Sequence, residues 1–183
     1  METLDTKLIE QSLEVLSLDS YFHDPNKWGR FTREALTTCA PLDFFLIPAS
    51  SSGKYHQGYE LGVGGLVRHT KAAMEVARTL FPLWDFSRKE EDMIMAALAL
   101  HDLAKPSKTH PIEAKLLLEP ISDFWYKEVE SVVDLIETHH GQWDHFGKMP
   151  RPKSTRQKFV HLCDYLASRK NIAVDINYKE ERT

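Results

Sequence analysis

The sequence predicts a single all-α domain, and three observations support this fold class. Apolar residues recur at helical spacing through most of the 183-residue chain, strand signals are weak, and stretches rich in proline and glycine separate the helical segments. The hydrophobic fraction of 42% and the charged fraction of 27% are ordinary for a globular protein, which excludes a disordered or fibrous chain. The length suits one compact domain better than two.

The N-terminal part predicts two helices and then a long connection. Residues 4–18 carry apolar side chains at roughly helical spacing, which predicts the first helix. An Asp-Pro-Asn start signal at 24–26 precedes a second helix over 26–39. The pattern breaks over 41–65, where prolines, serines and glycines interrupt it, and we expect an irregular loop there.

The remaining chain predicts a succession of helices. One runs over about 66–80, and the next begins at Ser87, where Glu90 three residues later completes a capping-box pattern. That helix is strongly apolar, and we expect it to be central and to end before Pro106, because the residue before a proline disfavours helix. Then follow a short helix over 111–118, a longer one over 122–140 that stops at Gly141, a loop over 144–154 and a last helix over 155–169 capped by Ser154 or Thr155.

Composition narrows the class of protein. The longest apolar run, 93–100, is far shorter than a membrane span, and the acidic, amphipathic N-terminus does not resemble a secretory signal. Two cysteines are too few for a disulfide framework, so a cytoplasmic location is expected. The net charge of −4 argues against a generic duplex-binding protein but is compatible with a small phosphorylated substrate beside a metal ion.

Polar residues that can bind a metal fall on the apolar faces of several predicted helices. His69 lies on the apolar stripe of the helix over 66–80. His101 and Asp102 directly follow the apolar run of the next helix, and Asp164 lies on the inward face of the last one. We therefore expect these four side chains to meet in the core.

A cation is the simplest way to satisfy such a group, because a buried carboxylate without a partner is strongly unfavourable. Mixed imidazole and carboxylate ligation suits Mn, Fe, Co, Ni or Zn, with Mg left as an alternative. For a single inward histidine the alternative is a hydrogen-bonded core residue, and for an aspartate near a helix end it is a local hydrogen bond. The conjunction of all four residues favours the metal.

The segments GGLVRHT, ALALHDLAKP, ETHHGQWD and FVHLCDYLASR together resemble the HD-domain metal-dependent phosphohydrolase superfamily. The resemblance implies that His69, His101, Asp102 and Asp164 hold a metal. It also implies an HD-domain helical core of about six to seven helices over 50–170, preceded by an N-terminal helical extension over 1–49, within a single domain 1–183. The GGLVRHT and THHG segments are similar to the HD domain of bacterial 3′–5′ exoribonucleases and to small stand-alone phage HD proteins, so the cytoplasm of a phage host is included in the expected location.

A second metal is implied by the likeness to dinuclear HD proteins, which places it on His110, His139 and His140. The short spacing between Asp102 and His110 and the absence of a Gly-Tyr-Pro signature argue against cyclic-dinucleotide hydrolysis. The alternatives are a surface role for His110 before a proline, and a substrate role for His140.

Lys105 shares a helix face with His101 and Asp102, since it follows them by four and three residues. The resemblance favours a contact between this ammonium and a substrate phosphate, because many relatives carry HD-x-x-K. The alternative is a cation that stabilises a helix C-terminus.

Two loops are candidates for substrate binding. Ser52 and His56 precede a glycine-rich approach to a helix N-terminus, which suits an anion. The loop over 145–158 contains no acidic residue and carries Lys148, Arg151 and Lys153. Ordinary solvated loops are the alternative in both cases.

The sequence thus predicts a metal-dependent phosphohydrolase with one or two ions, in which Asp102 and Lys105 are catalytic and the substrate is a nucleotide or another small phosphoester. The alternatives are a 3′–5′ exonuclease on single-stranded RNA or DNA, a di-iron oxygenase, and a non-catalytic binding module stabilised by metal. No membrane partner is expected, and the sequence does not indicate an oligomeric state.

Overall fold

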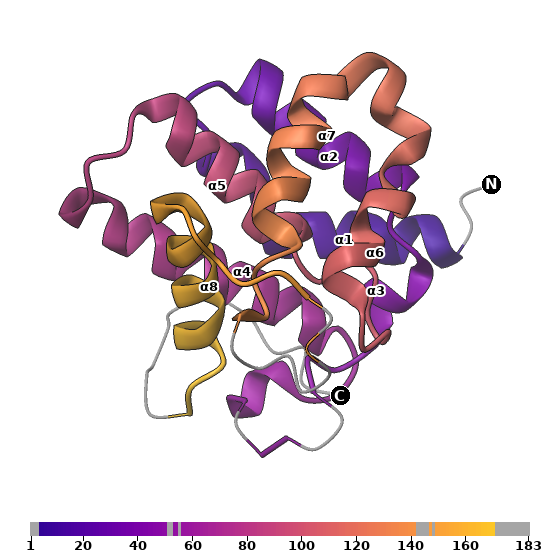
Figure 1. Ribbon diagram of the computed structural model, residues 1–183. Coiled ribbons are helices and arrows are strands. Elements are labelled where there is room, and N and C mark those ends of the chain that lie inside the picture. Colours follow the sequence, from indigo (N-terminus) through magenta and orange to yellow (C-terminus); the bar gives the residue numbers. More distant parts are fainter. Residues whose placement is uncertain (1–3, 51–52, 55, 142–146, 148, 171–183) are drawn as a thin grey trace.

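The computed structural model describes residues 4–50, 53–54, 56–141, 147 and 149–170. Within these residues the chain contains helices and turns but no strand, which confirms the all-α class (Figure 1). The α-helices are α1 (Leu4–Leu16), α2 (Arg30–Thr38), α3 (Leu42–Leu46), α4 (Gly65–Leu80), α5 (Arg88–Leu100), α6 (His110–Leu117), α7 (Ser122–Ile136) and α8 (Thr155–Ala167). Short helical turns cover Leu18–Ser20, Pro25–Gly29, Gly58–Glu60, Phe81–Leu83 and Glu119–Ile121.

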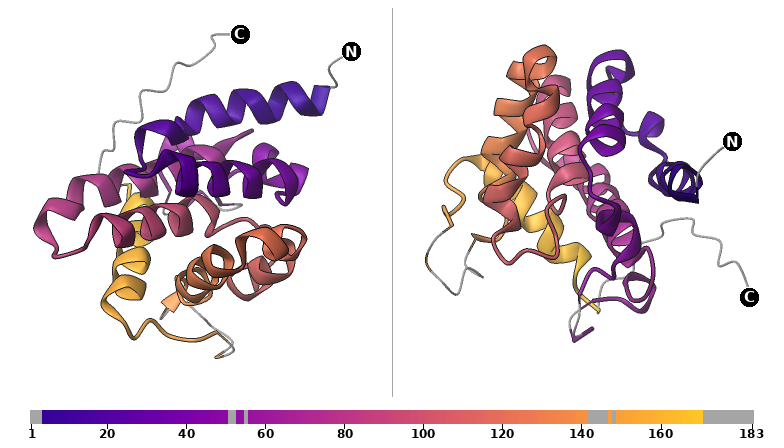
Figure 2. Two further views of the ribbon diagram at one scale, coloured as in Figure 1. Left: turned by 90° about the horizontal axis from the view of Figure 1, so that it is seen from above. Right: turned by 90° about the vertical axis from the view of Figure 1, so that its right-hand side faces the viewer.

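Helices α4 and α5 pack against each other at the centre of the molecule. Helices α1 and α2 cover one side of this pair, and α7 and α8 cover the other (Figure 2). Helix α6 packs against α7, and α3 packs against α4. The two central helices therefore contact nearly every other helix, which suits them to hold residues of a shared site.

Helix α5 is central because its sequence is apolar almost throughout its second half. Every residue over 94–100 is buried. The capping box of Ser87 and Glu90 is present at its start, as predicted. No helix in the described part of the chain is long and apolar enough to cross a bilayer.

The two helices that carry histidines at their C-terminal ends compare differently with the sequence prediction. Helix α5 stops at Leu100, before Pro106 as expected, and tight turns carry the chain to the proline. Helix α7 stops at Ile136 and not at residue 140, and Gly141 adopts a φ of 54° after further turns. In both places a histidine side chain binds a carbonyl of the last helical turn, as described below.

The connection over 41–65 is more ordered than predicted. It contains α3 and the turn Gly58–Glu60, so the expectation of an irregular loop throughout was wrong. Phe44 and Phe45 of α3 are fully buried, and this packing stabilises the helix. Five residues are too few to show helical periodicity in the sequence.

The hydrophobic core contains residues from Leu13 to Ala167. The residues before α4 therefore belong to the same core as the rest of the chain. The buried carboxylate of Asp92 on α5 accepts hydrogen bonds from the backbone N–H groups of His23 (2.7 Å) and Asp24 (2.9 Å). These hydrogen bonds connect the segment between α1 and α2 to the central helix α5.

The Asp92→Ala variant should lower the free energy of unfolding by about 1.5–3 kcal/mol, because two backbone donors lose a charged acceptor. Urea unfolding followed by circular dichroism measures the change. Asp85→Ala, at an exposed position just before α5, is the control and should change little. Equal stability of both variants would show that the Asp92 contacts contribute nothing net.

Candidate metal centre

Four of the predicted ligands converge in the core from α4, α8 and the turn that follows α5. His69 lies in the second turn of α4, His101 and Asp102 directly follow α5, and Asp164 lies on α8. His69 Nε2 is 3.0 Å from Asp164 Oδ1, and His101 Nε2 is 3.6 Å from the same oxygen. Asp102 Oδ2 completes the group at 3.3 Å from His101 Nε2 and 3.8 Å from His69 Nε2. We call these four residues the first cluster.

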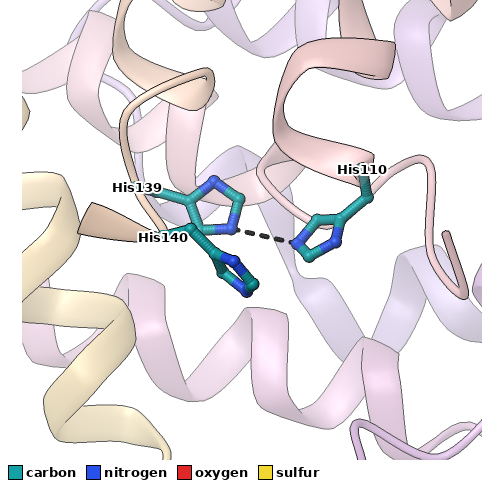
Figure 3. A group of neighbouring side chains, drawn as sticks. All are labelled: His110, His139 and His140. Atoms are coloured by element: carbon teal, nitrogen blue, oxygen red, sulfur yellow. Dashed lines mark hydrogen bonds between the residues drawn. The ribbon is translucent and has the colours of Figure 1, made fainter. Parts of the chain in front are cut away.

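A second cluster, His110, His139 and His140, lies on the other side of Asp102. His110 begins α6, and His139 and His140 follow α7; the three rings face one another (Figure 3). His110 Nε2 is 3.2 Å from His139 Nε2. The second carboxylate oxygen, Asp102 Oδ1, is 2.9 Å from His110 Nε2 and 3.7 Å from His139 Nε2. Asp102 thus presents one oxygen to each cluster.

Three of these imidazoles are oriented by backbone carbonyls three residues earlier in the chain. Nδ1 of His101 is 2.6 Å from the Leu98 carbonyl oxygen, and Nδ1 of His139 is 2.7 Å from that of Ile136. His110 makes the same contact with Ser107 at 2.8 Å. When Nδ1 donates in this way, Nε2 is left to face the cluster, which is the usual arrangement of a histidine ligand.

Charge–charge contacts raise the pKa of two imidazoles despite their burial. Burial alone would lower the pKa of His69, but hydrogen bonds and charge interactions with Asp164 and Glu60 raise it to about 9. For His101 the same burial penalty is exceeded by the attraction of Asp102 and Asp164, and the pKa rises to about 10. Both imidazoles are therefore protonated on both nitrogens, and positively charged, at neutral pH when no metal is bound.

The other ionisable groups shift in the directions that metal ligands require. The pKa values of Asp102 and Asp164 fall well below the usual range, because the neighbouring cations outweigh the burial penalty. Burial lowers the pKa of His139 to about 4, and it also lowers that of His140. Carboxylates and neutral imidazoles are the ligand forms of these side chains.

Unsatisfied atoms test whether the residues fit a metal ion. Among the described residues, His101 Nε2, Asp102 Oδ2 and His140 Nδ1 are buried and make no directed hydrogen bond. Lys105 Nζ and His101 Nε2 lie 2.7 Å and 3.3 Å from Asp102 Oδ2, but these charge contacts are not directed hydrogen bonds. Buried polar atoms without partners are rare, and these donor types are the ones that divalent transition metals prefer. The residues therefore fit the metal that the sequence predicts.

The predicted substrate residues are spread unevenly around these clusters. Lys105 and His56 lie beside the first cluster: Lys105 Nζ also donates to the carbonyl of Ala49 at 3.2 Å, and the His56 ring is 5.1 Å from that of His69. Arg151 and Lys153 are exposed before α8, and within the described residues no hydrogen bond or ion pair joins them to either cluster. Ser52 and Lys148 lie outside the described residues.

Sequence analysis missed one charged residue beside the first cluster. Glu60 is fully buried, and its carboxylate contacts both His56 and His69. The only signal in the sequence is an acidic residue inside the apolar, glycine-rich segment YELGVGGL.

The HD domain family matches residues 66–169, and the chain belongs to this family. The match includes every residue of both clusters as well as Lys105. Members of the family are metal-dependent hydrolases of the phosphohydrolase superfamily and bind divalent metals. Comparisons with curated proteins and with solved structures gave no match. The closer likeness to exoribonuclease and phage HD domains stays a prediction.

Metal binding near neutral pH should release about two protons per chain, because His69 and His101 must lose theirs to become ligands. Metal affinity should accordingly rise as the pH increases from neutral toward about 9. Titration calorimetry in buffers of different ionisation enthalpy measures the proton count. His69→Gln should release one proton fewer, and a count that does not depend on this residue would contradict the assignment.

Proposed function

We propose that this HD-domain protein hydrolyses a nucleotide or another small phosphoester with the help of two divalent metal ions. The observation that carries the proposal is the position of Asp102, whose two carboxylate oxygens face two separate sets of imidazoles. His69, His101 and Asp164 would complete one metal site. His110, His139 and His140 would complete the other.

Divalent ions held by these residues would lower the pKa of a bound water molecule toward about 7 and polarise a phosphoryl oxygen. The protein supplies the orientation of the ligands and a largely buried surrounding. His69, His101, Asp102, His110 and His139 are all at most 2% exposed, which keeps bulk water from competing for their charges.

The exposed parts of the first cluster indicate where a phosphate would enter. The side chains of Asp164 (21% exposed) and of the adjoining Lys105 (20%) and His56 (14%) reach solvent, whereas the other three residues of the first cluster are buried. Lys105 would move from Asp102 toward the phosphate and stabilise the negative charge that develops there. His56, in the connection between α3 and α4, would contact the phosphate or its leaving group. This limited opening favours a small substrate or a single-strand end over a duplex.

A phosphate-release screen tests the proposal. The substrates are nucleoside mono-, di- and triphosphates and short single-stranded RNA and DNA, each with Mn²⁺, Mg²⁺, Co²⁺ or Ni²⁺. We expect turnover of a nucleotide or simple phosphoester that Asp102→Ala abolishes together with the metal, while Asp134→Ala, at an exposed aspartate of α7, retains both. Shortening of oligonucleotides alone would support the exonuclease alternative. Metal binding without turnover of any substrate would support a non-catalytic module, and both results overturn the proposal.

Lys105→Ala should lower turnover by roughly ten- to a thousandfold, the range for losing one charge contact to a transition state. It should bind metal at least as tightly as the wild type, because its ammonium competes with the ion for Asp102 Oδ2. Turnover at saturating metal and the metal dissociation constant are measured on the same preparations. Lys108→Ala, at an exposed lysine three residues on, is the control. Unchanged turnover would leave Lys105 as an ion-pair partner only.

Metal stoichiometry tests the second site. Wild-type protein should hold about two ions per chain, and His110→Ala and His140→Ala should each hold about one. Elemental analysis after equilibrium dialysis measures the ratio, and His23→Ala, which changes an exposed histidine, serves as the control. One ion in all these proteins would indicate a mononuclear enzyme in which the histidine pair binds substrate.

A further inference from the structure

Glu60 is an ionisable residue buried without any solvent exposure, and the proposed reaction assigns it no role. It ends the helical turn Gly58–Glu60, close to the N-terminus of α4. Its two carboxylate oxygens contact different histidines: Oε1 lies 3.4 Å from His69 Nδ1, and Oε2 lies 2.6 Å from His56 Nδ1. One carboxylate thus connects a ligand of the first cluster to a residue at the site's opening.

His69 needs a side-chain acceptor for a reason that lies in its helix. His101, His110 and His139 lie at or beyond helix ends and bind nearby carbonyl oxygens through Nδ1. His69 lies inside α4, where the preceding carbonyls already accept the helix's own hydrogen bonds. Among these four imidazoles, it is the one whose Nδ1 faces a carboxylate. A carboxylate increases the basicity of a histidine ligand as well as fixing its ring.

The backbone around Glu60 is built to bring its side chain close to α4. The Glu60 carbonyl accepts a hydrogen bond from the N–H of Ala49 at 3.1 Å. A Cβ atom at Gly65 would lie 2.0 Å from that carbonyl oxygen, so only glycine fits there. The close approach of the Glu60 segment therefore explains the glycine at the first position of α4.

We propose that Glu60 is a positioning residue that fixes His69 with Nε2 directed at the metal and holds His56 at the site's opening. The proposal rests on the metal site of the proposed function. It predicts that loss of the carboxylate's charge weakens metal binding even when the side chain keeps its size and its hydrogen-bonding atoms. The effect should fall in the range of about 10–100-fold that is typical of residues behind a metal ligand.

The test compares Glu60→Gln with Glu75→Gln, which removes a buried carboxylate from the same helix bundle. Glu75 lies on α4 and contacts Tyr21 and Arg78. Mn²⁺ is titrated into the metal-free proteins, and the free ion is followed by its electron paramagnetic resonance. We expect a 10–100-fold higher dissociation constant for Glu60→Gln and a wild-type value for Glu75→Gln. Thermal unfolding of the metal-free variants shows whether either protein has lost its fold.

A measurement on wild-type protein tests the proposal even if the Glu60→Gln variant does not fold. In Zn²⁺-loaded protein with ¹⁵N-labelled histidine, the His69 ring should show a protonated, hydrogen-bonded Nδ1 and a metal-bound Nε2. Ligation through Nδ1, or an equal Mn²⁺ dissociation constant for folded Glu60→Gln and wild type, would overturn the role of Glu60. Wild-type protein that binds neither ion would overturn the metal site itself and Glu60's role with it. If the wild type binds metal and Glu60→Gln binds it more weakly as expected, but no phosphate is released, only the proposed reaction is overturned.

Discussion

The carboxylate of Asp102 is buried to 2% exposure, and the surrounding structure serves to compensate its charge. A buried anion of this kind is tolerated only when cations and hydrogen-bond donors reach it from several directions. Here they come from α4, from the chain after α5, and from the residues at α6 and after α7. The helices that pack around the α4–α5 pair are held at positions from which short imidazole side chains can reach one carboxylate. The packing of the hydrophobic core therefore also determines where the charged side chains lie around Asp102.

Helix ends do most of this placement. An α-helix leaves its last carbonyl groups without internal partners, and a histidine just beyond such an end can use one of them through Nδ1. His101 after α5 and His139 after α7 both do so, and each points Nε2 at Asp102 or its neighbours. His161 on α8 adds support from outside, since its Nδ1 lies 2.6 Å from the carbonyl oxygen of His139. The positions at which α5 and α7 end thus help to orient the histidines of the site.

Local sequence signals predicted most of the fold, because capping boxes and apolar stripes act over a few residues. The N-cap of α5 at Ser87 follows directly from such a signal, and the N-cap of α8 at Ser154 is one of the two positions that the sequence left open. The inward faces of His69 and Asp164 could likewise be read from periodicity. The end of α7 could not, since it depends on a side chain that reaches back to a carbonyl group. Glu60 escaped prediction because its partners are set by tertiary approach across Gly65, which leaves no periodic trace.

The charges at the centre also compensate one another when no metal is bound. Without an ion, protons on His69 and His101 and the ammonium of Lys105 face the carboxylates of Asp102 and Asp164. These positive charges lie beside the carboxylates that a divalent ion would bind. The carboxylates are therefore compensated both with and without the ion. Under the proposed function, metal uptake would exchange protons and one lysine contact for an ion. Under the proposed function, this exchange would free Lys105, whose side chain is partly exposed, to interact with a phosphate.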